Sequence, residues 1–387
     1  MKRIHSIDFT RGLVMVIMAL DHVRDLMHID SLTNDPTNLS TTTPGLFFTR
    51  LITHLCAPTF VFLSGTSAYI SFRKTKDIAA SKKFLLTRGI WLMVLEFTIV
   101  NFGLYFDIHF RMLIMEVICA IGFGFIVLSF LLKFPARNIG IAGLVIIFGH
   151  NLLQGISFPA SPGPNFFASV LFSLNMFQIS PDFSFLVGYP LIPWLGILLA
   201  GFGCGQLFEL SPQKRKKIFL QIGGAALLLF CLIRFTNIYG NPTKWAVQKT
   251  GLFTFLSFIN ITKYPPSLLF VLFTLGFMFL FLSFAEGISN RFTNFFVVYG
   301  NVPLFYFIIH IYLIHILMFI MVFMQGFGIK DLQFGALKFG RPQTGSGVEL
   351  PAIYLIWIGV VISLYPLCKW YGNYKAAHKE NKLLRYL

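Results

Sequence analysis

The apolar residues of this chain occur in long runs that short polar connections separate. About 20 consecutive apolar residues cross the hydrocarbon core of a bilayer as a helix, and the pattern predicts ten such helices. They lie near residues 9–29, 47–72, 84–106, 111–132, 139–157, 185–208, 217–235, 267–285, 295–324 and 351–372. We therefore expect an all-α fold, a polytopic membrane helical bundle that takes in residues 1–387 as a single domain.

A Pro- and Gly-rich stretch, residues 156–184, interrupts this pattern between the fifth and sixth predicted helices. Within it, residues 165–178 are apolar but too short to cross a bilayer. They predict a re-entrant or interfacial helix, and an eleventh span is the alternative.

Composition places the chain among membrane proteins. The mean hydropathy is +0.74, and charged residues make up 12% of the sequence, about half the share in soluble domains. The net charge of +16 would suit a nucleic-acid-binding protein. Its basic residues, however, lie mostly in short loops between the apolar runs. We therefore expect the lipid bilayer, and no nucleic acid, as a partner.

The distribution of basic residues predicts an orientation. One set of connections and both ends of the chain hold 20 lysines and arginines, whereas the opposite loops hold six. Because cytoplasmic loops are enriched in Lys and Arg, we expect both termini in the cytoplasm. The chain would then be a multi-pass protein of the cell inner (cytoplasmic) membrane, with residue 11 near the cytoplasmic face and residue 22 toward the outside.

Ionisable side chains on one face of the first predicted helix are the leading functional candidates. His22 and Asp25 are three residues apart, so the carboxylate is placed to hold the imidazole of a general base. Arg11 lies about 16 Å away along the helix, where a guanidinium suits phosphate groups. The structural alternatives are a helix-end histidine, and an arginine that snorkels or pairs with Asp8.

Other candidates lie in the second, third and ninth predicted helices. Arg50 and His54 share a face, and Pro58 then interrupts the helix. Glu96 lies mid-helix and needs a partner or neutralisation, so structural pairing, proton relay and substrate contact are the options. His310 is expected to contact substrate or the first helix. Because His315 points about 140° away from it, we predict no metal site there.

Several motifs in order resemble one known family. They are IDFTRG, MALDHVRD, APTFVFLSGTSA, LIPWLGILLAGFGCG, KYPPSLLFVLFTLG, YGNVPLFYFIIHIYLIH and the ending CKWYGNYKAAHKENKLLRYL. Together they resemble the bacterial branch of the heparan-α-glucosaminide N-acetyltransferase catalytic-domain family, within the transmembrane acyltransferases. The resemblance runs from residue 4 to the C-terminus.

The resemblance implies a membrane acyltransferase that takes an acetyl group from cytoplasmic acetyl-CoA to an acceptor on the other side. In the lysosomal relatives the acceptor is the amine of a terminal glucosamine. For this chain we expect a sugar or amino-sugar of the cell envelope, such as a glycolipid. The pattern of Arg11, Gly12 and His22 is similar to that of sugar O-acyltransferases. His28 and His54 compete with His22, because the lysosomal relatives carry their active histidine after the first helix. Direct transfer and an acyl-histidine route both remain open.

Two other interpretations fit the same residues. Intramembrane Asp, Glu and His beside Pro-broken helices are also typical of a proton-coupled secondary transporter of a small solute. The sequence, however, contains no matched pair of halves. A non-catalytic scaffold is the third interpretation, and a homodimer is compatible with any of them.

Overall fold

The computed structural model describes residues 4–155, 161–378, 380–381 and 384, and most of them are helical. The helices are α1 (His5–Met27), α2 (Pro44–Thr53), α3 (Cys56–Thr75), α4 (Ile78–Leu95), α5 (Asn101–Tyr105), α6 (Val117–Leu131), α7 (Ala136–Gly149), α8 (Pro162–Phe172), α9 (Leu191–Cys204), α10 (Pro212–Thr236), α11 (Gly251–Ile259), α12 (Leu268–Ala285), α13 (Arg291–Gly300), α14 (Pro303–Met324) and α15 (Leu350–Ala377). A π-helix, η1 (Glu96–Val100), joins α4 to α5, and 3₁₀ turns are η2 (His150–Gly155), η3 (Gly205–Glu209) and η4 (Ile329–Asp331).

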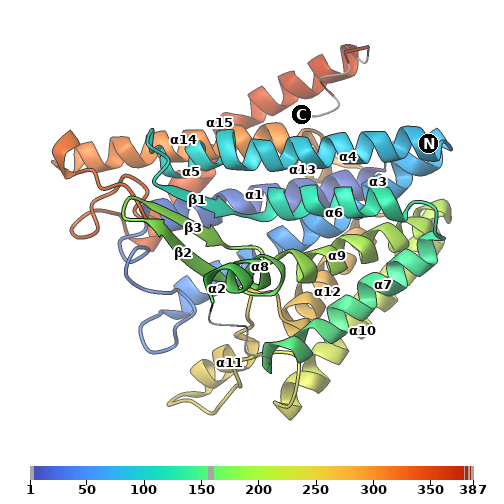
Figure 1. Cartoon of the computed structure of the whole chain (residues 1–387), viewed down its shortest axis with the longest axis horizontal. Coiled ribbons are helices and arrows are strands. Elements are labelled where there is room, and N and C mark those ends of the chain that lie inside the picture. The colour runs from blue at the N-terminus through green and yellow to red at the C-terminus, as the bar shows by residue number, and fades with distance from the viewer. Residues whose placement is uncertain (1–3, 156–160, 379, 382–383, 385–387) are drawn as a thin grey trace.

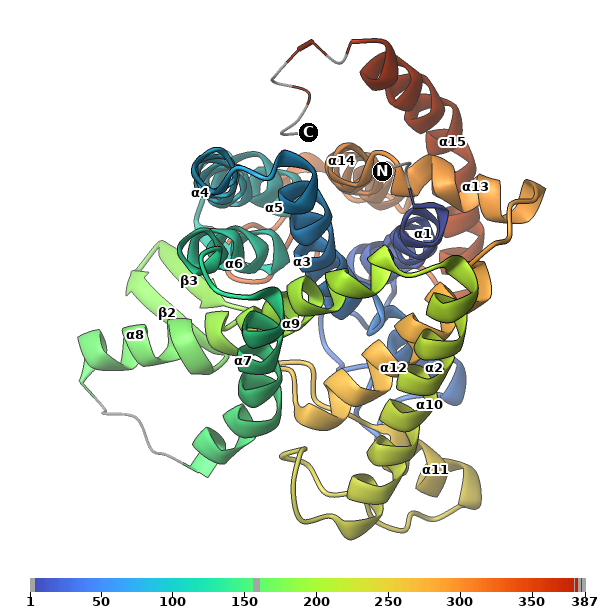
Figure 2. The same cartoon turned by 90° about the vertical axis from the view of Figure 1, so that its right-hand side faces the viewer.

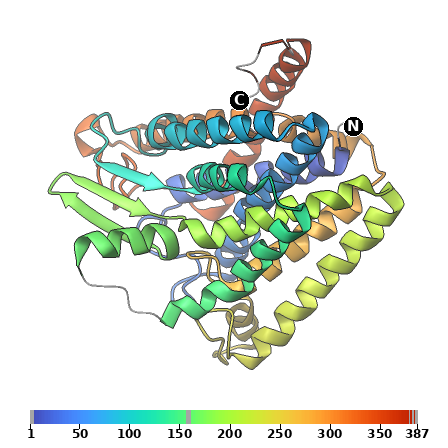
Figure 3. The same cartoon turned by 45° about the vertical axis from the view of Figure 1, so that its right-hand side comes forward.

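The long helices form one bundle around α1, which packs against α3, α12, α13, α14 and α15. Figure 1 shows the bundle from the side, with the N-terminal end of α1 at the right and the small sheet at the left. Figure 2 looks along the bundle from its right-hand end and shows α1 and α3 among the other helices. Figure 3 shows that the last part of α15 stands away from the rest.

Eight helical segments of the described residues are long and apolar enough to cross a membrane. They are Pro44–Thr75, Ile78–Tyr105, Ala136–Leu153, Leu191–Glu209, Pro212–Thr236, Leu268–Ala285, Pro303–Met324 and Leu350–Ala377. Two further predicted spans correspond to α6, which is shorter, and α1, which is long but carries several charges. The chain is thus a mostly helical polytopic bundle, while the count of ten and the cytoplasmic termini stay predictions.

A three-stranded sheet departs from the expected all-α fold. β1 (Met112–Met115) pairs in parallel with β3 (Phe183–Val187), and β3 pairs in antiparallel fashion with β2 (Asn175–Ser180). Asn101 of α5 fixes β1, because its side chain donates to the carbonyl of Met112 and accepts from the amide of Ile114. Apolar strands and apolar helices have similar composition, so periodicity alone did not separate them.

The sheet changes three predicted helices. Residues 111–132 begin as β1 and become helical only at α6, and residues 185–208 begin within β3. Residues 165–178 fold as the end of α8 followed by the start of β2 rather than as one helix. In the stretch 156–184, residues 156–160 lie outside the described part, and a re-entrant position for the rest stays a prediction.

Two predicted helices are broken next to a proline. The second has a turn at His54 and Leu55, between α2 and α3, because the ring of Pro58 conflicts with the carbonyl four residues earlier. The ninth divides at Asn301 and Val302 into α13 and α14, directly before Pro303. At this break, Arg50 binds Asp21, and His54 lines a cavity together with Arg24 and Asp25, so both side chains lie at the C-terminal end of α1.

Glycines allow α1 and α13 to cross at close range. A Cβ atom on Gly12 would meet the carbonyl oxygen of Phe296 at 1.8 Å, and one on Gly300 would meet that of Asp8 at 1.8 Å. Gly12 is therefore required for the close packing of α1 on α13. The neighbouring residue, Arg11, reaches Ser67 of α3.

Candidate functional site

His22 and His310 form a hydrogen-bonded pair inside the bundle. His22 belongs to α1 and His310 to α14, and the distance between His22 Nδ1 and His310 Nε2 is 3.1 Å. The ring centroids are 4.9 Å apart. His310 is fully buried, whereas part of the surface of His22 stays accessible. Contact with the first helix, one of the two expectations for His310, is thus present.

The surroundings of His310 fix the tautomers of both rings. His310 Nδ1 lies 2.9 Å from the carbonyl oxygen of Tyr306, and a carbonyl only accepts. In the neutral pair, His310 Nδ1 therefore carries a proton and its Nε2 accepts one from His22 Nδ1. This leaves His22 Nε2 unprotonated, which is the state that a general base or a nucleophile requires.

The acidic residues near His22 are engaged mainly with arginines. Asp21 is buried and accepts hydrogen bonds from Arg24 at 2.6 Å, from Arg50 at 2.8 and 2.9 Å, and from Thr53 at 2.8 Å. Asp25 is half exposed and pairs with Arg24, while the ring of His22 is hydrogen-bonded to His310. A role of Asp25 in orienting His22 stays a prediction. The contacts of Asp21 with Arg50 and Thr53 hold the C-terminal end of α1 against α2.

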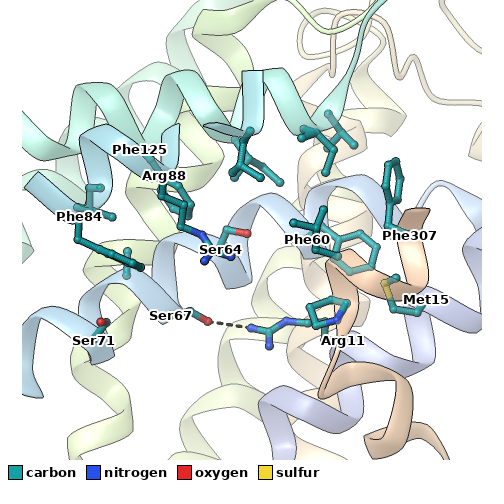
Figure 4. A pocket seen from close by; sticks show the side chains of 18 residues that line it. Arg11, Met15, Phe60, Ser64, Ser67, Ser71, Phe84, Arg88, Phe125 and Phe307 are labelled. Atoms are coloured by element: carbon teal, nitrogen blue, oxygen red, sulfur yellow. Dashed lines mark hydrogen bonds between the residues drawn. The ribbon is translucent and has the colours of Figure 1, made fainter. Parts of the chain in front are cut away.

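A narrow cleft of about 320 Å³ lies beside the first half of α1. Arg11 donates from Nη2 to the hydroxyl of Ser67 at 2.8 Å, and its Nη1 lies 3.6 Å from Asp8 Oδ1. Arg88 of α4 enters the cleft from the opposite wall, and Figure 4 shows both guanidinium groups turned toward the serines of α3. Those serines form a stripe with helical spacing, Ser64, Ser67 and Ser71.

The cleft runs from Arg11 toward the histidine pair. Its remaining walls are largely apolar, and they include Met15, one turn farther along α1, and Phe307 of α14. The Phe307 ring centroid is 6.4 Å from that of His22 and 5.7 Å from that of His310. Phe307 therefore contacts the histidine pair and also lines the cleft.

A second, polar cavity of about 630 Å³ lies at the C-terminal end of α1. Its charged lining residues are Arg24, Asp25, Asp35, Arg50 and Lys263. Along the face of α1 that carries the site, His22 lies between Met15 of the cleft and Asp25 of the cavity. Along α1, His22 thus lies between the residues that line the two hollows, and neither lining includes it.

The two competing histidines differ from His22 in their contacts. His54 lines the polar cavity, and its ring packs against Phe270 with centroids 5.4 Å apart. His28 follows α1, and its Nδ1 accepts the backbone N–H of Asp30 at 3.2 Å. Burial lowers the pKa of His28 below its usual range, so this ring is neutral at pH 7.

Glu96 has a structural contact within the bundle. Its Oε2 accepts the backbone N–H of Cys119 at 2.8 Å, in the first turn of α6. A carboxyl group placed there satisfies amide groups that have no partner inside their own helix. This contact supports structural pairing, the first of the options that the sequence offered for Glu96.

Two residues of the site were not among the predicted ones. Arg88 was counted only as a basic residue of a cytoplasmic loop, although it lies four residues inside the third predicted span. Lys263 was counted only as a basic residue of an outer loop. Two successive prolines, Pro265 and Pro266, follow Lys263 closely. They could have indicated a loop with a constrained backbone at this position.

Comparison with protein families gives one result. The model of the catalytic domain of heparan-alpha-glucosaminide N-acetyltransferase matches residues 3–237, which is more than half of the chain. Comparison with curated proteins gives no match. The matched region includes Arg11, His22 and Arg88 and ends before Lys263 and His310.

Proposed function

Because the chain belongs to the heparan-α-glucosaminide N-acetyltransferase catalytic-domain family, and is therefore of a membrane acetyltransferase type, we propose that it moves an acetyl group from acetyl-CoA to a sugar or amino-sugar acceptor. The donor enters from the cytoplasm and the acceptor from the outer side. The observation that carries this proposal is the His22–His310 pair between an arginine-bearing cleft and a polar cavity.

The cleft has the chemistry that an acyl-CoA donor needs. Arg11 and Arg88 supply two cations for phosphate groups, and a neighbouring hollow of about 220 Å³ adds Lys74 at the mouth. The apolar stretch past Met15 and Phe307 suits the long pantetheine arm. These residues hold the phosphates at the Arg11 end of the cleft and point the thioester toward His22.

His22 is the proposed general base. Its Nε2 takes the proton from the acceptor N–H or O–H as that atom bonds to the acetyl carbonyl carbon. The C–S bond then breaks, and His22 returns the proton to the departing thiolate. His310 accepts a hydrogen bond from the other ring nitrogen and holds the ring in place throughout.

An acyl-histidine route uses the same tautomer. His22 Nε2 would then bond to the acetyl carbon as the thiolate leaves, and the acceptor would take the acetyl group in a second step. The half-reaction separates the two routes. Protein incubated with labelled acetyl-CoA but no acceptor would retain label on His22 only in the second.

The test of the proposal separates binding from chemistry. His22→Ala should abolish acetyl transfer, a loss of about 10²–10⁴-fold, and should leave acetyl-CoA binding intact. Arg11→Ala should weaken acetyl-CoA binding more than His22→Ala does, and this binding should fall as salt rises. Thermal shift and radiolabel transfer with the full-length protein in lipid nanodiscs measure both.

His28→Ala and His54→Ala are the matched controls. If either of them removes turnover while His22→Ala does not, the chemistry lies on another histidine. Solute uptake into proteoliposomes without any acetyl-CoA binding would instead support the transporter interpretation.

A further inference from the structure

Lys263 is a buried cation without a carboxylate partner among the described residues. The residue is only 8% exposed, and no acidic oxygen of the described residues lies within 4.0 Å of its ammonium group. Its Nζ lies 5.0 Å from the ring centroid of Tyr264 and 5.9 Å from that of Tyr189. Aromatic faces attract a cation, and the ammonium group remains accessible from the polar cavity that Lys263 lines.

The segment around Lys263 is held firmly. Asn241 accepts hydrogen bonds from the amide of Thr262 and the hydroxyl of Ser267, on either side of Lys263. His150 binds the carbonyl oxygen of Pro266 at 2.7 Å. Because both flanks are tied, the ammonium group cannot leave the cavity wall by a simple shift of the loop.

The other cations of the cavity have acidic partners. Arg50 binds Asp21, and Arg24 binds both Asp21 and Asp25. The ammonium group of Lys263 also interacts electrostatically with His22 and with Asp21, so it lies near the proposed base. Among the described residues that line the cavity, Lys263 is therefore the cation without an ion-pair partner.

We propose that Lys263 is the anion-binding residue of the acceptor site, and that the acceptor is a sugar carrying a phosphate or a carboxylate. The anionic group binds the ammonium between Tyr189 and Tyr264, and the nucleophilic N–H or O–H of the same sugar faces His22. A charged acceptor gives the ammonium group the charged hydrogen-bond partner that it lacks among the described residues. This inference rests on the proposed acetyl transfer and names the class of acceptor.

Binding of simple sugars to the full-length protein in lipid nanodiscs tests the inference. The probes are glucosamine 6-phosphate, glucuronic acid, and the uncharged sugar glucose, each titrated calorimetrically. At least one anionic sugar should bind about tenfold or more tightly than glucose, because a hydrogen bond to a charged group is stronger than a neutral one. Preference for the first probe assigns a phosphate, and preference for the second a carboxylate.

Variants of Lys263 test whether the preference for anionic sugars depends on this residue. Lys263→Met should bring the anionic sugar down to the affinity of glucose, Lys263→Arg should retain part of the preference, and Lys249→Met in an exposed loop should change nothing. Equal binding of charged and neutral sugars by the unmodified protein would overturn the inference, and so would unchanged discrimination in Lys263→Met. Acetyl-CoA binding, measured in the same samples, tests the donor site separately.

Discussion

At the scale of single residues, the site depends on a chain of hydrogen bonds with one possible direction. The Tyr306 carbonyl accepts from His310, and His310 accepts from His22. A carbonyl cannot donate, so His310 must donate to it from Nδ1, and the other ring nitrogen of His310 must then accept from His22. A histidine held in this way presents its free nitrogen to a ligand without the entropy cost of choosing a tautomer or ring orientation.

Replacement of His310 should therefore slow acetyl transfer without weakening donor binding. His310→Ala removes the acceptor for His22 Nδ1–H, and we expect turnover to fall by about 10²-fold. The double variant with His22→Ala should lose little more than His22→Ala alone, since residues that act as a unit are not additive. Rates from radiolabel transfer and acetyl-CoA affinities from calorimetry check this. Full turnover in His310→Ala would exclude it as the positioning residue.

At the scale of elements, the site depends on how closely α1 meets its neighbours. The crossing with α13 has no room for a side chain at either Gly12 or Gly300. The same crossing sets the position of Arg11, whose side chain reaches Ser67 on α3 and lies 3.5 Å from the carbonyl oxygen of Gly300. Helix packing and the proposed donor site are thus linked at adjacent residues.

A methyl group at Gly12 should disturb both the packing of α1 on α13 and the binding of acetyl-CoA. Gly12→Ala should lower stability by about 1–3 kcal/mol, because backbone atoms of α13 must move away, and it should also weaken acetyl-CoA binding. The control is Gly359→Ala in α15, where an added Cβ meets no atom within 4 Å. Thermal unfolding in one detergent compares the two. Equal unfolding temperatures would mean that the close crossing is not present in solution.

At the scale of the whole molecule, the cleft beside Arg11 and the polar cavity beside Asp25 lie toward opposite ends of α1. Lys74 lines the hollow next to Arg11, near the start of α1. Arg341 is fully buried and binds the carbonyl oxygens of Leu26 and His28, at the other end. The loops that the basic-residue pattern assigns to different sides of the membrane are therefore separated along the bundle.

Reporter fusions can determine which end faces the cytoplasm. Fusions at residues 76, 215 and 380 should report a cytoplasmic position, and fusions at residues 40, 250 and 340 an outer one, because 20 basic residues lie on the first side. In-frame fusions to alkaline phosphatase and to green fluorescent protein measure this at each position. An outer signal at residue 215 would invert the proposed directions of donor and acceptor.

The sequence alone determined what depends on local pattern. Runs of apolar residues predicted most of the membrane helices, the helical spacing placed Arg11 and His22 on one helix, and ordered motifs indicated the family. The hydrophobic periodicity did not predict the short strands β1 to β3, because an apolar strand and an apolar helix have the same pattern over a few residues.

Only the tertiary structure decided which distant side chains meet. His310 reaches His22 across 288 residues, Arg88 faces Arg11 across a cleft, and Lys263 joins the wall of a cavity formed by the end of α1. No spacing encodes these contacts, because each depends on how separate helices cross and on loops tied far from the residue itself. A buried charge has its partner chosen by packing, and for Asp21 of α1 packing brings Arg50 of α2 within 2.8 Å.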